Sequence, residues 1–140
     1  MSLSIYQRHL DTIPKQYRLL KLFRPPIYVI ELSNNQVSAV CYYKDGSSKR
    51  HQINADFSNR RMVIADFLSA VQAITDLLLK FPKHPFGISS FAVVNVTEEL
   101  IDGLTMIEIK AIREAVWAAS GQAKRRIVSS TVNYQGQVVS

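Results

Sequence analysis

Residues 27–55 read IYVIELSNNQVSAVCYYKDGSSKRHQINA, and this stretch decides the fold of the chain. Its first two thirds are rich in β-branched and aromatic residues, which are typical of strands. Asn34-Asn35 and Asp45-Gly46 are tight-turn signals that divide the stretch into three parts. The sequence therefore predicts three consecutive antiparallel strands, at residues 27–32, 36–43 and 48–55.

The next element downstream is an amphipathic helix within residues 62–81. Apolar residues recur there at spacings of three and four, which places them on one buried stripe of a helix. The stripe consists of Phe67, Val71, Ile74, Leu78 and Phe81. Asp66 or Ser58 could cap the start, because their side chains accept hydrogen bonds from free backbone N–H groups. Pro82 and Pro85 are expected to end the helix.

A buried strand and a second helix follow. Residues 91–96, FAVVNV, are almost continuously apolar, which is typical of a central strand covered on both faces. Thr105 and Glu108 match the capping-box pattern and open the helix. Its apolar stripe consists of Ile109, Ile112, Val116 and Ala119, and its predicted end is Gly121. A strand is then predicted at residues 126–130, and residues 132–139 are left open as a further strand.

The predicted order of elements is β-β-β-α-β-α-β, with an extra C-terminal strand left open. Antiparallel strands followed by crossover helices imply a mixed sheet with helices packed on it, an α/β fold. A chain of 140 residues has room for one domain, which we place at residues 25–140. Residues 1–24 are predicted to be a separate, basic amphipathic segment.

The N-terminal segment divides near residue 12. Residues 1–12 are polar and are predicted to be loosely ordered. Residues 13–24, IPKQYRLLKLFR, are predicted to form a short helix with apolar side chains on one half of its circumference. Basic side chains occupy most of the other half. Pro25-Pro26 ends the helix, because proline disfavours helical geometry in the residue before it.

The net charge of +6 resides in the first half of the chain. Residues 1–61 hold ten basic and four acidic residues, whereas residues 62–140 hold seven of each. Such an asymmetry favours an anionic partner, although a solvated surface also accounts for it. No apolar run approaches the ~18 residues of a membrane-spanning helix, and the single cysteine fits a reducing compartment. A cytoplasmic location is therefore predicted.

The sequence carries no catalytic signature. His9, His51 and His84 lack the spacing of a zinc site, and the predicted strands lack the carboxylate cluster of a two-metal nuclease. Cys41 lies among apolar strand residues and is predicted to be packed rather than nucleophilic. We therefore predict no catalytic residue, no metal, no cofactor and no enzymatic activity.

Several short segments resemble known bacterial families. Residues 62–67, MVIADF, and residues 104–121, LTMIEIKAIREAVWAASG, resemble segments of the rod-shape actin MreB. Residues 57–61, FSNRR, and residues 104–108 are similar to the YjaA family of small, stress-associated proteins. The resemblance spans residues 20–130 and implies a truncated first subdomain of the actin-like, ribonuclease H-like fold.

The same resemblance places Glu31 and Glu108 where actin-like ATPases use carboxylates, to hold the hydrated metal and to orient the attacking water. It places the first phosphate loop of that family at residues 28–37. Ser33 and Asn34 add side chains there, where glycine would let backbone N–H groups approach a phosphate. We therefore expect both carboxylates to be vestigial, with Glu108 serving the helix cap.

These observations predict a non-enzymatic interaction module. Rod-shape actins touch the membrane through a short basic amphipathic segment before their first strand, and the resemblance assigns that role to residues 19–24. The predicted contacts are Leu19, Leu20, Lys21, Leu22, Phe23 and Arg24. The opposing interpretation is that Leu20 and Phe23 fold back onto the domain. Trp117 is expected at the edge of the core, where partial exposure would favour a partner surface.

The expected partner is a protein, either from the cell-shape machinery or a second copy forming a dimer, with weak peripheral contact to the inner membrane as a further option. The alternative function is that of a nucleic-acid-binding stress protein that uses its basic first half. The candidate phosphate contacts are Lys49-Arg50, Arg60-Arg61 and Lys124-Arg125-Arg126.

Overall fold

The structure, a computed structural model, describes residues 2–13, 15–58, 64–82, 89–97, 103–134 and 137–139. The N-terminal part consists of α1 (Ser2–Asp11), a 3-10 turn η1 (Lys15–Tyr17) and α2 (Arg18–Leu22). The remainder consists of β1 (Ile27–Ser33), β2 (Gln36–Tyr42), β3 (Ser48–Asn54), α3 (Phe67–Leu79), β4 (Ser90–Val96), α4 (Met106–Ala123), β5 (Ile127–Tyr134) and β6 (Gln137–Val138). The predicted order of elements is confirmed.

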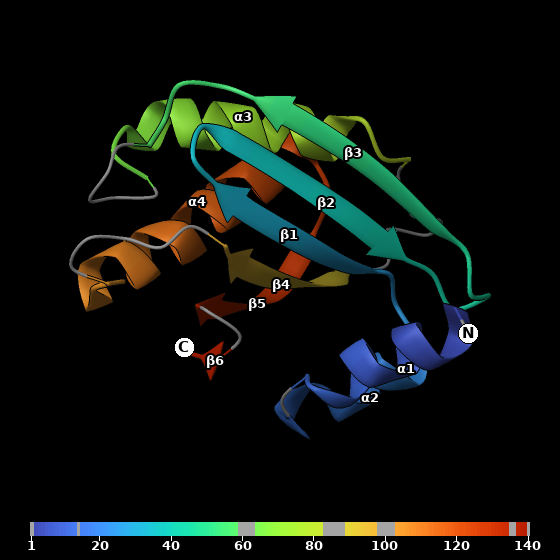
Figure 1. Cartoon of the computed structure of the whole chain (residues 1–140). Coiled ribbons are helices and arrows are strands. Elements are labelled where there is room, and N and C mark those ends of the chain that lie inside the picture. The colour runs from blue at the N-terminus through green and yellow to red at the C-terminus, as the bar shows by residue number, and fades with distance from the viewer. Residues whose placement is uncertain are drawn as a thin grey trace.

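The described strands form one mixed sheet in the order β3-β2-β1-β4-β5-β6 (Figure 1). β1 pairs antiparallel with β2 and parallel with β4, and β5 continues the parallel pairing. The mixed sheet and its covering helices confirm the predicted α/β fold class, and they agree with the actin-like, ribonuclease H-like half-domain that the resemblance implied. The prediction for the C-terminus is corrected, because residues 132–134 belong to β5 and β6 is only two residues long.

α3 and α4 pack against the same face of the sheet, behind it in Figure 1. Alternate side chains of β1, those of Tyr28, Ile30 and Leu32, are fully buried in the core beneath these helices. Glu31 lies between two of them and therefore points to the opposite face, where it is exposed. β4 is buried at all but one position, which confirms its prediction as the central strand.

The caps of α3 and α4 follow the predicted chemistry. The Asp66 side chain accepts a hydrogen bond from the Ser69 N–H, so Asp66 and not Ser58 caps α3. The capping box between Thr105 and Glu108 is present at the start of α4. Glu108 Oε2 accepts from the Thr105 N–H at 3.1 Å, and Thr105 Oγ1 accepts from the Glu108 N–H at 3.2 Å.

Three details of the helix predictions are corrected or untested. Gly121 does not end α4, because the helix continues to Ala123, which is buried in the core. Lys124 instead adopts the left-handed conformation, with φ of 56°, and ends the helix. Phe67 is 38% exposed and stands outside the buried stripe of α3. Pro85 lies outside the described residues.

The prediction that residues 1–12 are loosely ordered is wrong. They include α1, whose Tyr6 and Leu10 are buried together with Ile13, against Ile27 and Phe91 at the lower end of the sheet. Tyr6 Oη donates a buried hydrogen bond of 2.7 Å to the Pro25 carbonyl. The spacing of these three apolar residues, four and then three positions, is that of a helix stripe within an otherwise polar segment.

His9 connects α1 to the sheet and makes the stability of the fold dependent on pH. Its ring stacks on Tyr42, with centroids 5.2 Å apart. Burial, together with the charge of Arg8, lowers the pKa of His9 below its usual value, so the native state favours the neutral ring. The contribution of His9 to stability is therefore fully present above about pH 6.5 and falls as pH decreases, because the unfolded chain takes up a proton that the native chain resists.

We predict that His9→Gln reduces the loss of unfolding free energy between pH 7.5 and pH 5. Urea unfolding of both proteins at the two pH values measures the difference, and all other titrating groups are shared. Equal losses in the two proteins would show that His9 makes no contribution to the pH dependence.

Candidate docking surface

The segment of residues 19–24 divides into side chains that face solvent and side chains that face the protein. Leu19, Leu22 and Phe23 are 71%, 78% and 66% exposed and lie three and four positions apart on one side of α2. We call these three residues the α2 ridge. Leu20 instead packs against the cluster formed by Tyr6, Leu10, Ile13, Ile27 and Phe91.

The opposing interpretation, in which Leu20 and Phe23 fold back onto the domain, therefore holds for Leu20 and is wrong for Phe23. Leu20 is corrected from a predicted contact to a residue that packs against the protein. α2 is anchored through Leu20, so the ridge is presented on a fixed support. Apolar side chains of this size that remain exposed on an anchored helix are candidates for contact with another surface.

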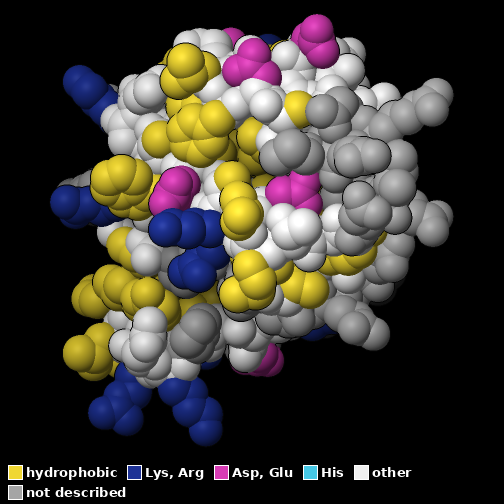
Figure 2. Space-filling view, turned by 90° about the vertical axis from the view of Figure 1, so that its left-hand side faces the viewer, with side chains coloured by type: hydrophobic (Ala, Val, Ile, Leu, Met, Phe, Trp, Pro, Cys, Tyr) yellow, Lys and Arg dark blue, Asp and Glu magenta, His cyan; other side chains and the backbone are white. Residues whose placement is uncertain are grey.

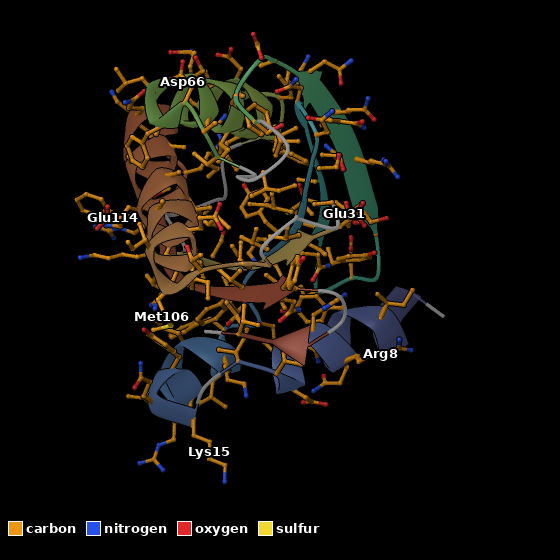
Figure 3. All side chains as sticks on the ribbon, turned by 60° about the vertical axis from the view of Figure 1, so that its left-hand side comes forward. Arg8, Lys15, Glu31, Asp66, Met106 and Glu114 are labelled. Atoms are coloured by element: carbon orange, nitrogen blue, oxygen red, sulfur yellow. The ribbon has the colours of Figure 1, made fainter. Side chains whose placement is uncertain are left out.

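Basic residues surround the α2 ridge. Lys15 and Arg18 are exposed, and Figure 3 shows Lys15 directed away from the body of the protein. Lys21 Nζ donates to the Ile13 carbonyl at 3.3 Å, and the Arg24 guanidinium lies 5.3 Å from the centre of the Tyr6 ring. Lys21 and Arg24 thus also hold α2 against the protein, whereas Lys15 and Arg18 extend into solvent.

The space-filling view shows that apolar and basic side chains also lie together over a wider area of the surface. In Figure 2, hydrophobic side chains gather over much of the left half of the face, with Lys and Arg side chains among them. Trp117 on α4 is 74% exposed, so it lies in solvent rather than at the edge of the core. Among the described helices, none is long and apolar enough to cross a membrane.

The turn to which the resemblance assigns the first phosphate loop contains a network of internal hydrogen bonds. Asn35, with φ of 53°, forms the turn between β1 and β2. Its Oδ1 accepts from the backbone N–H groups of Phe57 and Ser58 at 2.9 and 2.8 Å, and its own N–H donates to Ser58 Oγ at 2.8 Å. A phosphate at this turn would need free backbone N–H groups as donors, but the Asn35 N–H already donates to Ser58.

Replacing Asn35 with alanine is predicted to lower the unfolding free energy by about 2 to 4 kcal/mol, because it removes the Oδ1 acceptor and leaves alanine in a left-handed geometry that asparagine tolerates better. Asn35→Gly tolerates that geometry and is predicted to lose less, and Asn35→Asp retains the acceptor and is predicted to lose least. Urea unfolding measures the series. Equal losses for glycine, aspartate and alanine would show that the network does not hold the turn.

The two carboxylates assigned by resemblance have different surroundings. Glu108 is 3% exposed and forms the capping box, while its Oε1 has no hydrogen-bond partner in the described structure. Glu31 is exposed on the opposite face of the sheet from α3. Among the residues that the structure describes, no group of three or more His, Cys, Asp or Glu side chains could hold a metal ion.

Cys41 is fully buried, as predicted, and burial raises the pKa of its thiol to about 12. A thiol with so high a pKa remains protonated and is a weak nucleophile at neutral pH. His51 packs edge-on against Phe81, with ring centroids 4.8 Å apart, and His84 lies outside the described residues. Neither Cys41 nor His51 has the surroundings of an activated catalytic residue.

The basic residues proposed for nucleic-acid contact are only partly available. Lys49 and Arg50 are exposed on the edge strand β3, and Arg60-Arg61 lies outside the described residues. Lys124 and Arg126 are exposed, but Arg125 is 7% exposed and donates hydrogen bonds to the carbonyls of Phe81 and Ala123. Arg125 is therefore corrected from a candidate contact to a structural residue, which sequence spacing alone does not reveal.

No protein-family model and no curated protein sequence matches the chain. Among solved structures, it is similar to the ethanolamine utilization protein EutJ from Carboxydothermus hydrogenoformans, with a TM-score of 0.44 and 12% identity over 83% of this chain and 50% of that one. It is also similar to the PPX-GPPA enzyme of Aquifex aeolicus, with a TM-score of 0.41 and 12% identity over 79% of this chain and 36% of that one. The chain thus spans half of the first structure and about a third of the second, and neither likeness bears on the site.

Proposed function

We propose that the chain is a non-enzymatic docking module that attaches reversibly to an anionic membrane surface through the α2 ridge. The observation that carries the proposal is the exposure of Leu19, Leu22 and Phe23 beside Lys15 and Arg18 on a helix anchored by Leu20. Amphipathic helices with apolar and basic side chains in this arrangement bind the interface of anionic bilayers.

The expected strength is modest. Burying a Leu or Phe side chain in the bilayer interface contributes at most about 1.5 to 3 kcal/mol, and each basic residue near an anionic leaflet contributes about 1 kcal/mol. A single short helix therefore supports weak, reversible attachment. Such an attachment suits a protein that is recruited and released rather than permanently anchored.

The absence of enzymatic activity is part of the same proposal. It is supported by the turn at Asn35, whose N–H is bonded to Ser58, and by the use of Glu108 as a helix cap. A thermal shift measured with magnesium and ATP tests it. We expect no shift, and a shift that disappears in Glu31→Ala would overturn the non-enzymatic assignment.

Sedimentation with lipid vesicles tests the attachment. We expect the full chain to sediment with vesicles of phosphatidylcholine and phosphatidylglycerol and much less with phosphatidylcholine alone. Replacing Leu19, Leu22 and Phe23 together with serine should weaken binding by about tenfold or more, since a tenfold change requires only about 1.4 kcal/mol. The replaced side chains are exposed, so the fold should be retained, and circular dichroism verifies this.

The matched control replaces Leu68 and Leu79 of α3 with serine. Their exposed fractions, 78% and 53%, resemble those of the ridge, but they lie on another helix. The control should bind like the unmodified chain. Equal binding by the ridge variant, or equal loss in the control, would contradict attachment through the α2 ridge.

Residues 1–24 cannot simply be removed for this test. Tyr6, Leu10 and Ile13 cover Ile27 and Phe91, so a truncated chain would expose core residues of the sheet. Exposed core side chains bind vesicles nonspecifically or aggregate. Point substitutions on the ridge separate membrane contact from folding, whereas truncation combines the two.

We further propose that the protein belongs with the YjaA-like, stress-associated bacterial proteins and meets MreB-type cell-shape machinery at the inner membrane. The support is the strand order of the sheet together with the resemblance of residues 57–67 and 104–121. A pull-down from bacterial lysate, with the full chain and the ridge variant, should enrich cell-shape proteins. Enrichment of nucleic-acid-associated proteins alone, lost after nuclease treatment, would favour the alternative function.

That alternative, nucleic-acid binding, is favoured by Lys49 and Arg50, which are exposed on the edge strand β3. Its affinity should fall steeply with salt, because binding releases counterions from the phosphates. Lys49→Gln with Arg50→Gln should abolish it while leaving vesicle binding unchanged.

A further inference from the structure

The outer side of α4 borders an open groove, and none of the three residues of the α2 ridge lines it. The groove has a volume of about 570 Å³, and its floor is formed by Ile109, Val116, Ile127 and Val128 from α4 and β5. A second hollow, of about 690 Å³, adjoins it and shares Trp117 and Ile127. We call the two together the α4 groove.

One stripe of α4 forms the rim of this groove. Met106, Lys110, Arg113 and Trp117 all line it and follow each other at spacings of four, three and four residues. These spacings place the four side chains on one side of the helix over about three turns. Met106 and Trp117, which end the stripe, are 80% and 74% exposed. The rim therefore offers apolar contacts at both ends and positive charge between them.

The charge of the groove is predominantly positive. Its described lining includes Lys110, Arg113, Lys124 and Arg126, and a single acidic residue, Glu114. Glu114 lies 3.9 Å from Lys110, so it offsets part of that lysine's charge and leaves the other three cations. A partner that fits this lining must combine acidic groups with apolar ones.

We propose that the α4 groove binds an acidic amphipathic helix of a partner protein. Apolar side chains of such a helix would contact Trp117 and the floor, and its acidic side chains would face Arg113 and Lys124. Binding an amphipathic helix in an apolar groove is a general mode of peptide recognition, and charge complementarity sets the orientation. The α2 ridge of a second copy fits less well, because Lys15 and Arg18 beside it carry the same sign of charge as the groove.

The groove and the α2 ridge meet at Tyr17, which precedes α2 and also lines the groove. In Figure 3, the Met106 end of α4 lies close to α2. A helix bound in the groove would therefore lie beside the ridge. The protein could hold a partner next to whatever surface the ridge contacts, yet the groove proposal does not depend on the membrane proposal.

Trp117 supplies the measurement, because it is the only tryptophan in the chain. The probe is a synthetic peptide without tryptophan, as long as the 18 residues of α4, with Leu on one helical face and Glu on the other. A second peptide has Lys in place of Glu, and a third has the first peptide's residues in scrambled order. We expect the Glu peptide to produce a saturable blue shift of Trp117 emission, and the other two to produce none.

Two neighbouring residues supply a matched pair of variants. Met106 lines the groove and Ile107 does not, although they are 80% and 79% exposed. Met106→Ser should weaken peptide binding by about tenfold, whereas Ile107→Ser should leave it unchanged. Lys110→Glu with Arg113→Glu should abolish binding of the Glu peptide, and circular dichroism verifies that all three variants fold.

Three results would overturn the proposal. The first is the absence of a Trp117 shift with the Glu peptide. The second is equal binding of the Lys or scrambled peptide, or equal loss in the two serine variants. The third is a Trp117 emission that is already blue-shifted and depends on protein concentration, since the occupant would then be a second copy. Vesicle binding is measured separately, so failure of either proposal leaves the other intact.

Discussion

Replacing Arg125 with alanine is expected to lower the free energy of unfolding by about 3 to 5 kcal/mol, because a buried cation that satisfies buried carbonyls is removed. Its Nε and Nη2 donate to the Phe81 carbonyl at 3.2 and 2.8 Å, and its Nη1 donates to the Ala123 carbonyl at 2.8 Å. Hydrogen bonds of charged groups contribute more than neutral ones, and their loss leaves two carbonyls without these donors.

The effect is large because Arg125 joins elements that are distant in sequence. Phe81 follows the end of α3, and Ala123 ends α4, so one guanidinium holds both helix ends at the start of β5. Urea unfolding followed by circular dichroism measures the loss. Arg125→Lys should retain part of the stability, since an ammonium group cannot reproduce the planar fork of donors.

Arg126 provides the control for this experiment. It is the next residue in the chain, carries the same charge and is exposed. Arg126→Ala should change the free energy of unfolding by less than about 0.5 kcal/mol, as surface substitutions usually do. A comparable loss in both variants would indicate a general effect of charge, and the structural role of Arg125 would be wrong.

Tyr6→Ala is the second substitution with a large expected effect, about 3 to 5 kcal/mol, as for other buried aromatic residues. Tyr6 is fully buried, and burial raises the pKa of its hydroxyl group to about 12. Its ring fills the cluster that joins α1 to Ile27 and Phe91, and its hydroxyl donates to the Pro25 carbonyl.

Tyr6→Phe separates the two contributions, since it retains the ring and removes only the hydrogen bond. We expect it to cost about 1 kcal/mol. Gln7→Ala, at the exposed position that follows, should have little effect. Thermal unfolding of the three variants measures the series, and limited proteolysis should cut the Tyr6→Ala variant first within residues 2–24. If proteolysis of that variant begins elsewhere, Tyr6 does not anchor α1.

A comparison of the strands and helix caps with α1 shows how far the sequence predicts the fold. The strands, the turn at Asn34-Asn35 and the caps at Asp66 and Thr105 were predictable because each depends on neighbours within a few positions. α1 was not, because its apolar residues are few and its stability comes from the sheet that it covers. Its only local signal was the spacing of Tyr6, Leu10 and Ile13.

The end of α4 gives a second example. Gly121 has the residue type that usually follows a helix, but burial of Ala123 in the core extends the helix by a further half turn. Lys124 then adopts the left-handed conformation that glycine would accept more readily. Local propensity predicts that the helix ends at Gly121, but packing of the helix against the sheet extends it to Ala123.

For the candidate surfaces, too, the sequence determines some features and the tertiary structure determines the others. The sequence by itself determined which residues around α2 are apolar or basic, and it carries no catalytic motif of recognisable spacing. Only the tertiary structure decided that Leu20 faces the core while Leu19, Leu22 and Phe23 face solvent. It also decided that Arg125 is internal and that Met106, Lys110, Arg113 and Trp117 border one groove. The physical reason is that hydropathy and charge belong to each residue, whereas burial depends on which distant segments pack against it.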